Sequence, residues 1–68
     1  MKTVKYVVEL EPGQFYSKHF ESPFDLDNID IIWLFSAYDI AEKISSGFRG
    51  EYPFSRVLPV TIEFTLGE

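Results

Sequence analysis

Apolar and polar side chains alternate from Thr3 to Glu11, and this period-two pattern predicts a strand with one buried face. The apolar face is made by Val4, Tyr6, Val8 and Leu10. Val7 interrupts the polar side, so the second face of this strand is expected to be partly covered as well. The strand ends at Pro12-Gly13, because proline fixes φ and glycine accepts the positive φ of a type II turn. A two-residue hairpin prefers a primed turn, so a slightly longer loop is expected here.

Two later segments also have the character of strands. Residues 14–20 are expected to return as a second strand, and neither of its faces is cleanly apolar, as is typical of an edge or interface strand. Residues 21–30 contain Ser22-Pro23, three Asp and one Asn, which favour a loop. The last strand spans residues 57–66, with these side chains facing inward: Val60, Ile62, Phe64 and Leu66. Pro59 cannot donate a ladder hydrogen bond, so it is expected near the start of this strand or on a sheet edge.

The segment from Asn28 to Gly47 allows two interpretations. The first is a single helix from about Asn28, because apolar residues recur at steps of three and four. The second, which we favour, is a short strand at Ile31–Phe35 followed by a helix that Ser36 caps, because Ser36 and Asp39 resemble a capping box. In both, the helix ends near Gly47, where glycine can adopt the left-handed cap conformation.

These elements predict that residues 1–68 form a single small α+β domain. The order is β-β-(β)-α-β, and one helix packed on one face of a three- or four-stranded, mainly antiparallel sheet makes a two-layer fold. The first and last strands have the cleanest apolar faces. They are expected to lie side by side beneath Ile40, Ala41 and Ile44.

The small size of the chain limits its stability. A core of 68 residues rarely supplies more than about 3 to 5 kcal/mol, and without cysteine there is neither a disulfide nor a thiolate zinc site to add to it. Dense packing of the seven Phe, four Tyr and one Trp, or self-association, must compensate. Phe48, Tyr52 and Phe54 lie in the connection 48–56, so these rings either fold over the core or face a partner.

Negative charge is concentrated in the middle of the chain. Residues 21–42 hold six acidic residues and no Lys or Arg, in a chain of net charge −5. Such a stretch disfavours direct binding to nucleic acid, which takes clustered basic residues, and suits a protein partner with a basic surface. The alternative is that these acids only keep the protein soluble. With neither a signal-peptide pattern nor an apolar run of the roughly 18 residues that a membrane span needs, a cytoplasmic protein without membrane association is expected.

The sequence predicts no catalytic residue, no metal ligand and no cofactor site. His19 is the single histidine, and Ser17 on the same strand face does not make a catalytic site without a third group to orient His19. A calcium loop starting at Asp25 would need an oxygen ligand, a glycine and a glutamate at its fifth, sixth and twelfth positions, and all three are missing. The glycines make no phosphate-binding pattern. The protein is therefore expected not to be an enzyme.

Aromatic residues are interleaved with the acidic residues between Phe20 and Glu42. Buried aromatic anchors with a charged rim are typical of protein interfaces. Trp33 and Phe35 are expected in the core, so they are left out of the candidate site. The candidate partner-binding residues are Glu21, Phe24, Asp25, Asp27, Asp30, Asp39 and Glu42.

Residues 5–10, 14–16, 35–44 and 57–62 together resemble small proteins that are common in phage and prophage genomes, some of which inhibit host defence, including anti-CRISPR proteins. The resemblance implies a hairpin, a serine-capped helix and a last strand. It transfers no catalytic or binding residue, because the matching positions belong to the core and the helix cap. It implies a stoichiometric inhibitor in the host cytoplasm, whose acidic face occupies the basic groove of a nucleic-acid-handling, CRISPR-like complex.

A homo-oligomer is the alternative from a different functional class. A structural or regulatory accessory subunit, similar to an antitoxin or a virion accessory protein, could self-associate through Tyr16, Phe20 and the 48–54 segment. The small core and the number of aromatic residues favour this alternative equally.

Overall fold

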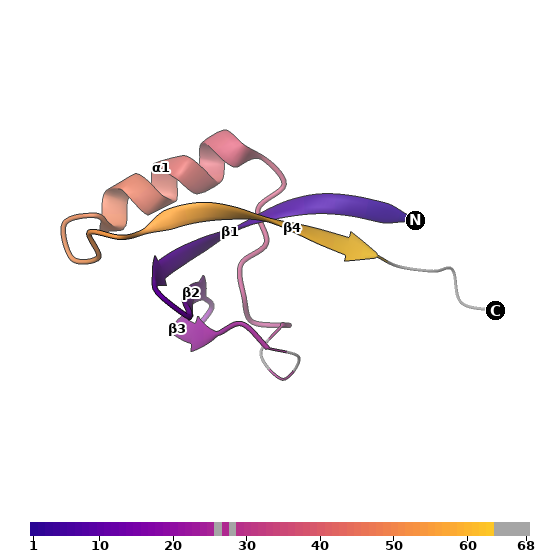
Figure 1. Ribbon diagram of the computed structural model, residues 1–68, viewed down its shortest axis with the longest axis horizontal. Helices are drawn as coiled ribbons and strands as arrows, with labels where there is room; N and C mark the ends of the chain where they lie inside the picture. The colour runs from indigo at the N-terminus through magenta and orange to yellow at the C-terminus, as the bar shows by residue number, and fades with distance from the viewer. Residues whose placement is uncertain (26, 28, 64–68) are drawn as a thin grey trace.

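The computed structural model describes residues 1–25, 27 and 29–63. Within these residues it has four strands and one helix, in the order β1 (Lys2–Glu11), β2 (Gln14–Ser17), β3 (Phe20–Pro23), α1 (Tyr38–Phe48) and β4 (Arg56–Glu63). The strands form one antiparallel sheet in the order β3-β2-β1-β4, and α1 lies along β1 and β4 (Figure 1). The predicted α+β fold, with one helix on a three- or four-stranded, mainly antiparallel sheet, is confirmed, and the sheet has four strands.

The first and last strands pair as predicted, from Lys2 opposite Glu63 to Glu9 opposite Arg56. Directly opposed side chains share a face of the sheet, and neighbours along a strand alternate between faces. Val57 is opposite Val8 and packs with it beneath α1, whereas Val60 is opposite Lys5, on the other face. The predicted alternation along β4 is confirmed, since Val60 and Ile62 are half-buried between exposed neighbours, but the register places them on the face of the sheet away from α1 rather than beneath it. Phe64 and Leu66, predicted inward with them, lie outside the described residues.

Pro59 occupies the open edge of the sheet, as predicted. Its partner Tyr6 uses both backbone groups on the other side of β1, where its N–H and C=O each bond Phe35 at 2.8 Å. The pair of Tyr6 and Pro59 is therefore of the non-hydrogen-bonded kind, and the nitrogen of Pro59 points to the outer edge of β4. A proline at this position removes no ladder bond and leaves the edge without one donor for pairing with another chain.

The connection between β1 and β2 is tighter than predicted. Only Pro12 and Gly13 separate the two strands, and Gly13 has the expected positive φ of 83°. A register shift between Glu9 and Glu11 accompanies this short turn. An extra residue of this kind adds local twist, so the hairpin does not need the longer loop.

Residues 14–23 form two strands instead of one strand and a loop. The chain turns back at Lys18-His19, and β3 pairs with β2 from Ser17 opposite Phe20 to Gln14 opposite Pro23. The predicted continuous strand to Phe20 was wrong, as was the loop at residues 21–23. Pro23 is tolerated here because β3 is an edge strand.

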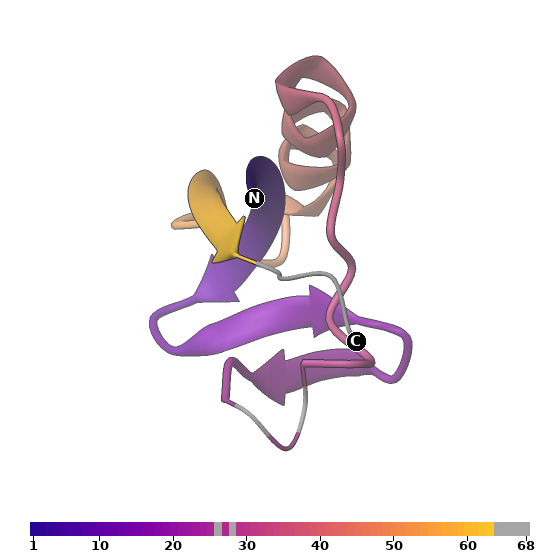
Figure 2. The ribbon, with the colours of Figure 1, turned by 90° about the vertical axis from the view of Figure 1, so that its right-hand side faces the viewer.

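The segment 31–35 is extended, which excludes the single long helix, but it does not form a regular strand. It lies where β1 and β2 diverge, and it forms one isolated bridge to each side: Phe35 pairs with Tyr6 of β1, and Ile32 pairs with Ser17 of β2. Ile31 C=O accepts from Lys18 N at 2.7 Å. Figure 2 shows this segment rising beside the sheet to the start of α1. Ile32 is 4% exposed, so the segment fills the space between the diverging strands with an apolar side chain.

The ends of α1 differ from the prediction. The N-cap is Ala37, which has no side-chain cap bond in the described structure, and Ser36 Oγ instead accepts a hydrogen bond of 2.8 Å from Lys5 Nζ. At the other end, Arg49 is the C-cap with φ −65°, and Gly47 lies inside the helix rather than in a left-handed cap. The capping-box pattern does not operate because the helix begins one residue later than predicted, which leaves Ser36 before the N-cap position.

The core lies between α1 and the adjoining face of the sheet, where Val8, Leu10 and Ala41 have no exposed surface. Ile44 packs against this cluster as predicted, but Ile40 is 54% exposed and the prediction for it was wrong. On the other face of β1, Val7 is 1% exposed, which confirms that both sides of this strand are covered.

Candidate functional site: an aromatic cluster with an acidic rim

Six aromatic rings from five parts of the chain meet beside the core. Tyr16 of β2 lies at the centre, with ring centroids 5.3 Å from Phe48 and 6.5 Å from three other rings. We call this group the aromatic cluster; its members are Tyr16, Phe20, Trp33, Phe35, Phe48 and Tyr52. The helix, β2, β3 and the segments on either side of the helix each contribute, so only the complete fold assembles it.

Phe20 reaches the aromatic cluster through an unusual backbone conformation. Its φ of 83° makes it the one non-glycine residue with a positive φ in the described part of the chain. For a bulky residue this conformation is an outlier that costs of order 1 to 3 kcal/mol. In a regular strand Phe20 would share the face of its partner Ser17, away from Tyr16. The left-handed backbone turns the ring toward Tyr16, Phe48 and Tyr52 instead.

The aromatic cluster is partly open to solvent. Phe20 is 42% exposed and Trp33 is 43% exposed, whereas the other four rings are half-buried. Trp33 was predicted to belong to the core, and that prediction was wrong because the 31–35 segment lies where β1 and β2 diverge and not beneath the helix. Large, partly exposed rings on a packed base are the usual anchors of protein interfaces.

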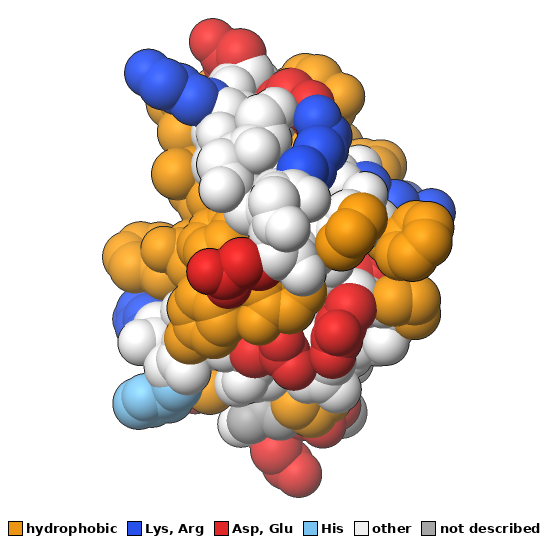
Figure 3. Space-filling view, turned by 90° about the vertical axis from the view of Figure 1, so that its left-hand side faces the viewer, with side chains coloured by type: hydrophobic (Ala, Val, Ile, Leu, Met, Phe, Trp, Pro, Cys, Tyr) orange, Lys and Arg blue, Asp and Glu red, His pale blue; other side chains and the backbone are white. Residues whose placement is uncertain are grey.

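The negative charges of three glutamates act on Tyr52, at one end of the aromatic cluster. Partial burial raises the pKa of Tyr52 above its ordinary value of 10.0, and a hydrogen bond from its hydroxyl to the Glu21 carboxylate raises this pKa further. The negative charges of Glu21, Glu51 and Glu11 add to the effect. We call these three residues the acidic rim. Figure 3 views this end of the molecule, where acidic side chains lie within and beside a band of apolar ones.

The raised pKa of Tyr52 predicts how stability depends on alkaline pH. The folded state holds the Tyr52 proton more tightly than the unfolded state, so this stabilisation is complete below about pH 10 and is lost as pH rises through the folded-state pKa. Urea unfolding at pH 8, 10 and 11 should therefore show a steeper alkaline loss for the wild type than for Tyr52→Phe. Parallel curves for the two proteins would contradict the assignment.

Of the predicted binding residues, only Glu21 belongs to the acidic rim. Phe24 is half-buried against Phe15, with ring centroids 5.2 Å apart. The exposed residues Asp25 and Asp27 form a local turn, in which Asp27 N donates to Asp25 Oδ1 at 2.9 Å. Asp30 is exposed in the same segment, which lies across β1 from α1 (Figure 1).

The two predicted helix residues lie elsewhere. Asp39 is exposed in the first turn of α1, and Glu42 forms an ion pair of 2.9 Å with Arg49. Together with the preceding aspartates, these positions do not make one continuous acidic face. The sequence block of negative charge is divided by the fold between the β3–α1 segment, the helix and the acidic rim.

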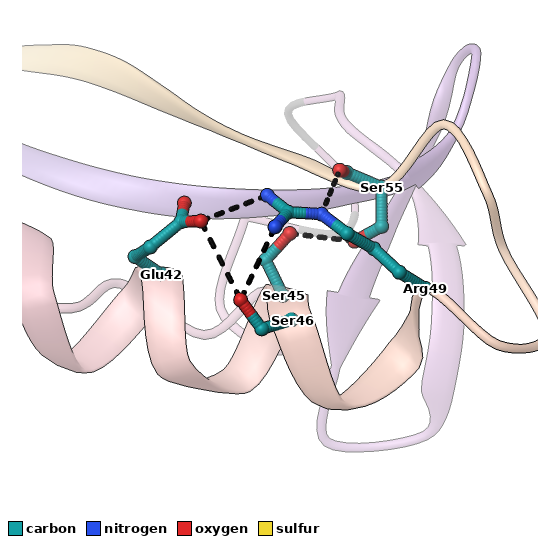
Figure 4. A network of polar contacts seen from close by, with 5 residues as sticks. All are labelled: Glu42, Ser45, Ser46, Arg49 and Ser55. Atoms are coloured by element: carbon teal, nitrogen blue, oxygen red, sulfur yellow. Dashed lines mark hydrogen bonds and ion pairs between the residues drawn. The ribbon is translucent and has the colours of Figure 1, made fainter.

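Glu42 instead takes part in a network that fixes the end of α1 (Figure 4). Arg49 Nε donates to Ser55 C=O at 3.2 Å, and Arg49 Nη1 donates to Ser46 Oγ at 3.2 Å. The buried hydroxyls of Ser45 and Ser55 are 2.8 Å apart. These bonds join the helix end to the start of β4 and so hold Phe48 and Tyr52, which lie between them, in place.

Glu11 and Glu51 were missed from the sequence. Neither lies in the acidic block 21–42, and no local pattern links the end of β1 to the loop after α1. Among the described residues there is no group of three or more His, Cys, Asp or Glu that could hold a metal ion, the acidic rim included. None of the helices described is both long enough and apolar enough to span a membrane.

The geometry therefore defines a surface suited to contact with another molecule: anchored rings at the centre and carboxylates at the edge. Comparison with protein-family models, with curated proteins and with solved structures finds no match to this chain, so its function has to be inferred from this surface alone.

Proposed function

We propose that this protein is a protein-binding module without enzymatic activity, which holds a basic partner surface against the aromatic cluster and the acidic rim. The observation that carries the proposal is the position of Tyr52: its ring contacts Phe20 and Phe48, and three carboxylates act on its hydroxyl. A Lys or Arg side chain of the partner would gain attraction from both the ring faces and the carboxylates. The net charge of −5 favours encounter with such a partner.

The resemblance to phage-encoded inhibitors extends this proposal to a biological role. If the basic partner surface is a groove that holds nucleic acid, a bound module of this kind excludes the nucleic acid and acts as a stoichiometric inhibitor in the host cytoplasm. The acidic rim would then take the place of backbone phosphates, which bind the same basic side chains.

Charge reversal at the acidic rim tests the proposal. The double variant Glu11→Lys/Glu51→Lys is expected to lose the partner, because both residues are exposed and the substitution places positive charge opposite a basic surface. Binding is measured by capture of partners from lysate, followed by titration with the purified partner at low and high salt. An affinity loss of at least tenfold is expected.

A matched control uses the predicted aspartates. Asp25→Lys/Asp27→Lys makes the same change of charge at two exposed positions outside the acidic rim, and it is expected to bind nearly as well as the wild type. The opposite result, with loss of binding only in the aspartate variant, would mean that the partner binds the aspartates predicted from the sequence and not the acidic rim.

Self-association is the second candidate, because the fold does bring together Tyr16, Phe20, Phe48 and Tyr52. Against it, two copies meeting at this surface would place their acidic rims face to face, which costs several kcal/mol unless salt screens it. Sedimentation at low and high salt is therefore expected to show a monomer in both. A dimer that persists at low salt would favour the homo-oligomer.

A further inference from the structure

A pocket of about 310 Å³ opens on the face of the sheet turned away from α1, and its lining comes from Glu9, Pro12, Phe54 and Arg56. Glu9 and Arg56 are directly opposed on β1 and β4. Since Val8 faces the helix, its neighbour Glu9 faces the opposite side. The pocket is therefore separate from the aromatic cluster, and its volume lies at the lower end of the range for small-ligand sites.

The guanidinium of Arg56 is held in place by a buried carboxylate. Glu9 is only 8% exposed, and its Oε1 accepts a hydrogen bond of 2.8 Å from Arg56 Nε. The other oxygen, Oε2, accepts a long hydrogen bond of 3.4 Å from Gly13 N. Both oxygens of Glu9 are thus occupied. An arginine anchored in this way loses less conformational freedom when it binds a further group than an unconstrained one does.

The far end of the same guanidinium remains available. Arg56 is 63% exposed at its side chain, and Nη1 and Nη2 make no hydrogen bond or ion pair within residues 1–25, 27 and 29–63. Two parallel N–H donors on a planar group match the two oxygens of a carboxylate. The charges of Glu9 and Arg56 cancel, so the pocket lining carries no net negative charge that would repel an anionic ligand.

The remaining walls are apolar. Phe54 is 78% exposed, more than any other aromatic side chain of the described residues, and Pro12 lies on the turn between β1 and β2. Leaving a phenyl ring this far in water has no benefit for the fold itself. A ligand with an apolar body would bury it beside the arginine.

We propose that this pocket binds a carboxylate carried on an apolar or aromatic body, with Arg56 Nη1 and Nη2 on the carboxylate and Phe54 against the body. Glu9 is a positioning residue that fixes the guanidinium. The carboxylate can belong to a free organic acid or to the C-terminal residue of a peptide, since both present the same group.

Titration of ¹⁵N-labelled protein with benzoate, followed by amide chemical shifts, tests the proposal. Saturable shifts are expected at Gly13, Phe54 and Arg56, and benzamide, which lacks the charge, should bind at least tenfold more weakly. Acetyl-alanyl-phenylalanine and its C-terminal amide form a second pair of probes. Tighter binding of this acid than of benzoate identifies a peptide source, and the reverse identifies a free acid.

Three variants separate recognition from folding. Arg56→Lys keeps the charge but lacks the paired donors, and Arg56→Gln lacks both, so each should weaken benzoate binding at least tenfold. Phe54→Ala changes an exposed residue and should weaken benzoate binding severalfold. The amide spectrum of the variant should be unchanged away from the substitution. Benzoate binding that survives Arg56→Gln, or tighter binding of the cation benzamidine than of benzoate, would overturn the proposal. Both outcomes are independent of the acidic rim.

Discussion

Replacing Leu10 by alanine is expected to remove most of the stability of the protein and to leave a substantial fraction of it unfolded at 25 °C. Leu10 has no exposed surface and packs with Val8 and Ala41 at the centre of the core. Truncating a buried leucine to alanine costs about 2 to 5 kcal/mol, through lost burial and the cavity left behind. A domain of this size has only about 3 to 5 kcal/mol in total, so one substitution removes most of it. Circular dichroism with urea or heat measures the loss.

Val4→Ala is the matched control for Leu10→Ala. Val4 lies on the same strand and was assigned to the same apolar face, but it is 48% exposed, because α1 does not cover this end of β1. Its truncation is expected to cost less than about 1 kcal/mol. Similar losses for the two variants would mean that the core does not lie at the Leu10 end of the strand.

Replacing Tyr16 by alanine is expected to divide the aromatic cluster and to destabilise the fold by about 3 kcal/mol. Within the aromatic cluster, the five rings other than Tyr16 form two groups, Trp33 with Phe35, and Phe20 with Phe48 and Tyr52. Tyr16 alone contacts both groups: it stacks on Trp33 and Phe35 and meets Phe20 and Phe48 edge-on or tilted. Its loss should therefore weaken partner binding as well as stability. The measurements are urea unfolding and partner titration under conditions where the variant remains folded.

Trp33 gives a direct optical signal for this prediction, because it is the single tryptophan and stacks on Tyr16 with centroids 6.5 Å apart. Native-state fluorescence of Tyr16→Ala should shift to longer wavelength as water reaches the indole. Phe15→Ala, one residue away with a single ring contact to Phe24, should leave the emission unchanged. An unchanged spectrum in Tyr16→Ala would show that the cluster does not depend on its central ring.

Local sequence patterns were sufficient to predict β1, β4 and the turn after β1. Alternation placed the first and last strands, the glycine after Pro12 placed the turn, and the missing N–H of Pro59 limited it to a strand start or a sheet edge. Each of these predictions depends either on the backbone chemistry of one residue or on the period-two alternation of a strand. Both properties hold in any fold that buries one face of the strand. The α+β class followed from the same patterns.

Patterns that depended on a competing partner were misinterpreted. Ser36 and Asp39 have the spacing of a capping box, but α1 begins one residue later, and the Ser36 hydroxyl binds Lys5, which is 31 positions away in sequence. The segment 31–35 has the composition of a strand. It lies where β1 and β2 diverge, so it forms only one isolated bridge to each of them. In both cases the deciding contact joins distant parts of the chain, and no local window contains it.

The candidate site shows the same division more strongly. The sequence determined that aromatic and acidic residues are abundant and that the net charge is negative, because those quantities are sums over the chain. Which rings meet, and which carboxylates border them, was decided by the tertiary structure. The left-handed backbone of Phe20 turns its ring toward Phe48 and Tyr52, 28 and 32 positions away, and the charge of Glu11 acts on Tyr52 from 41 positions away. Proximity in space is set by strand pairing and packing, and residue order alone does not contain it.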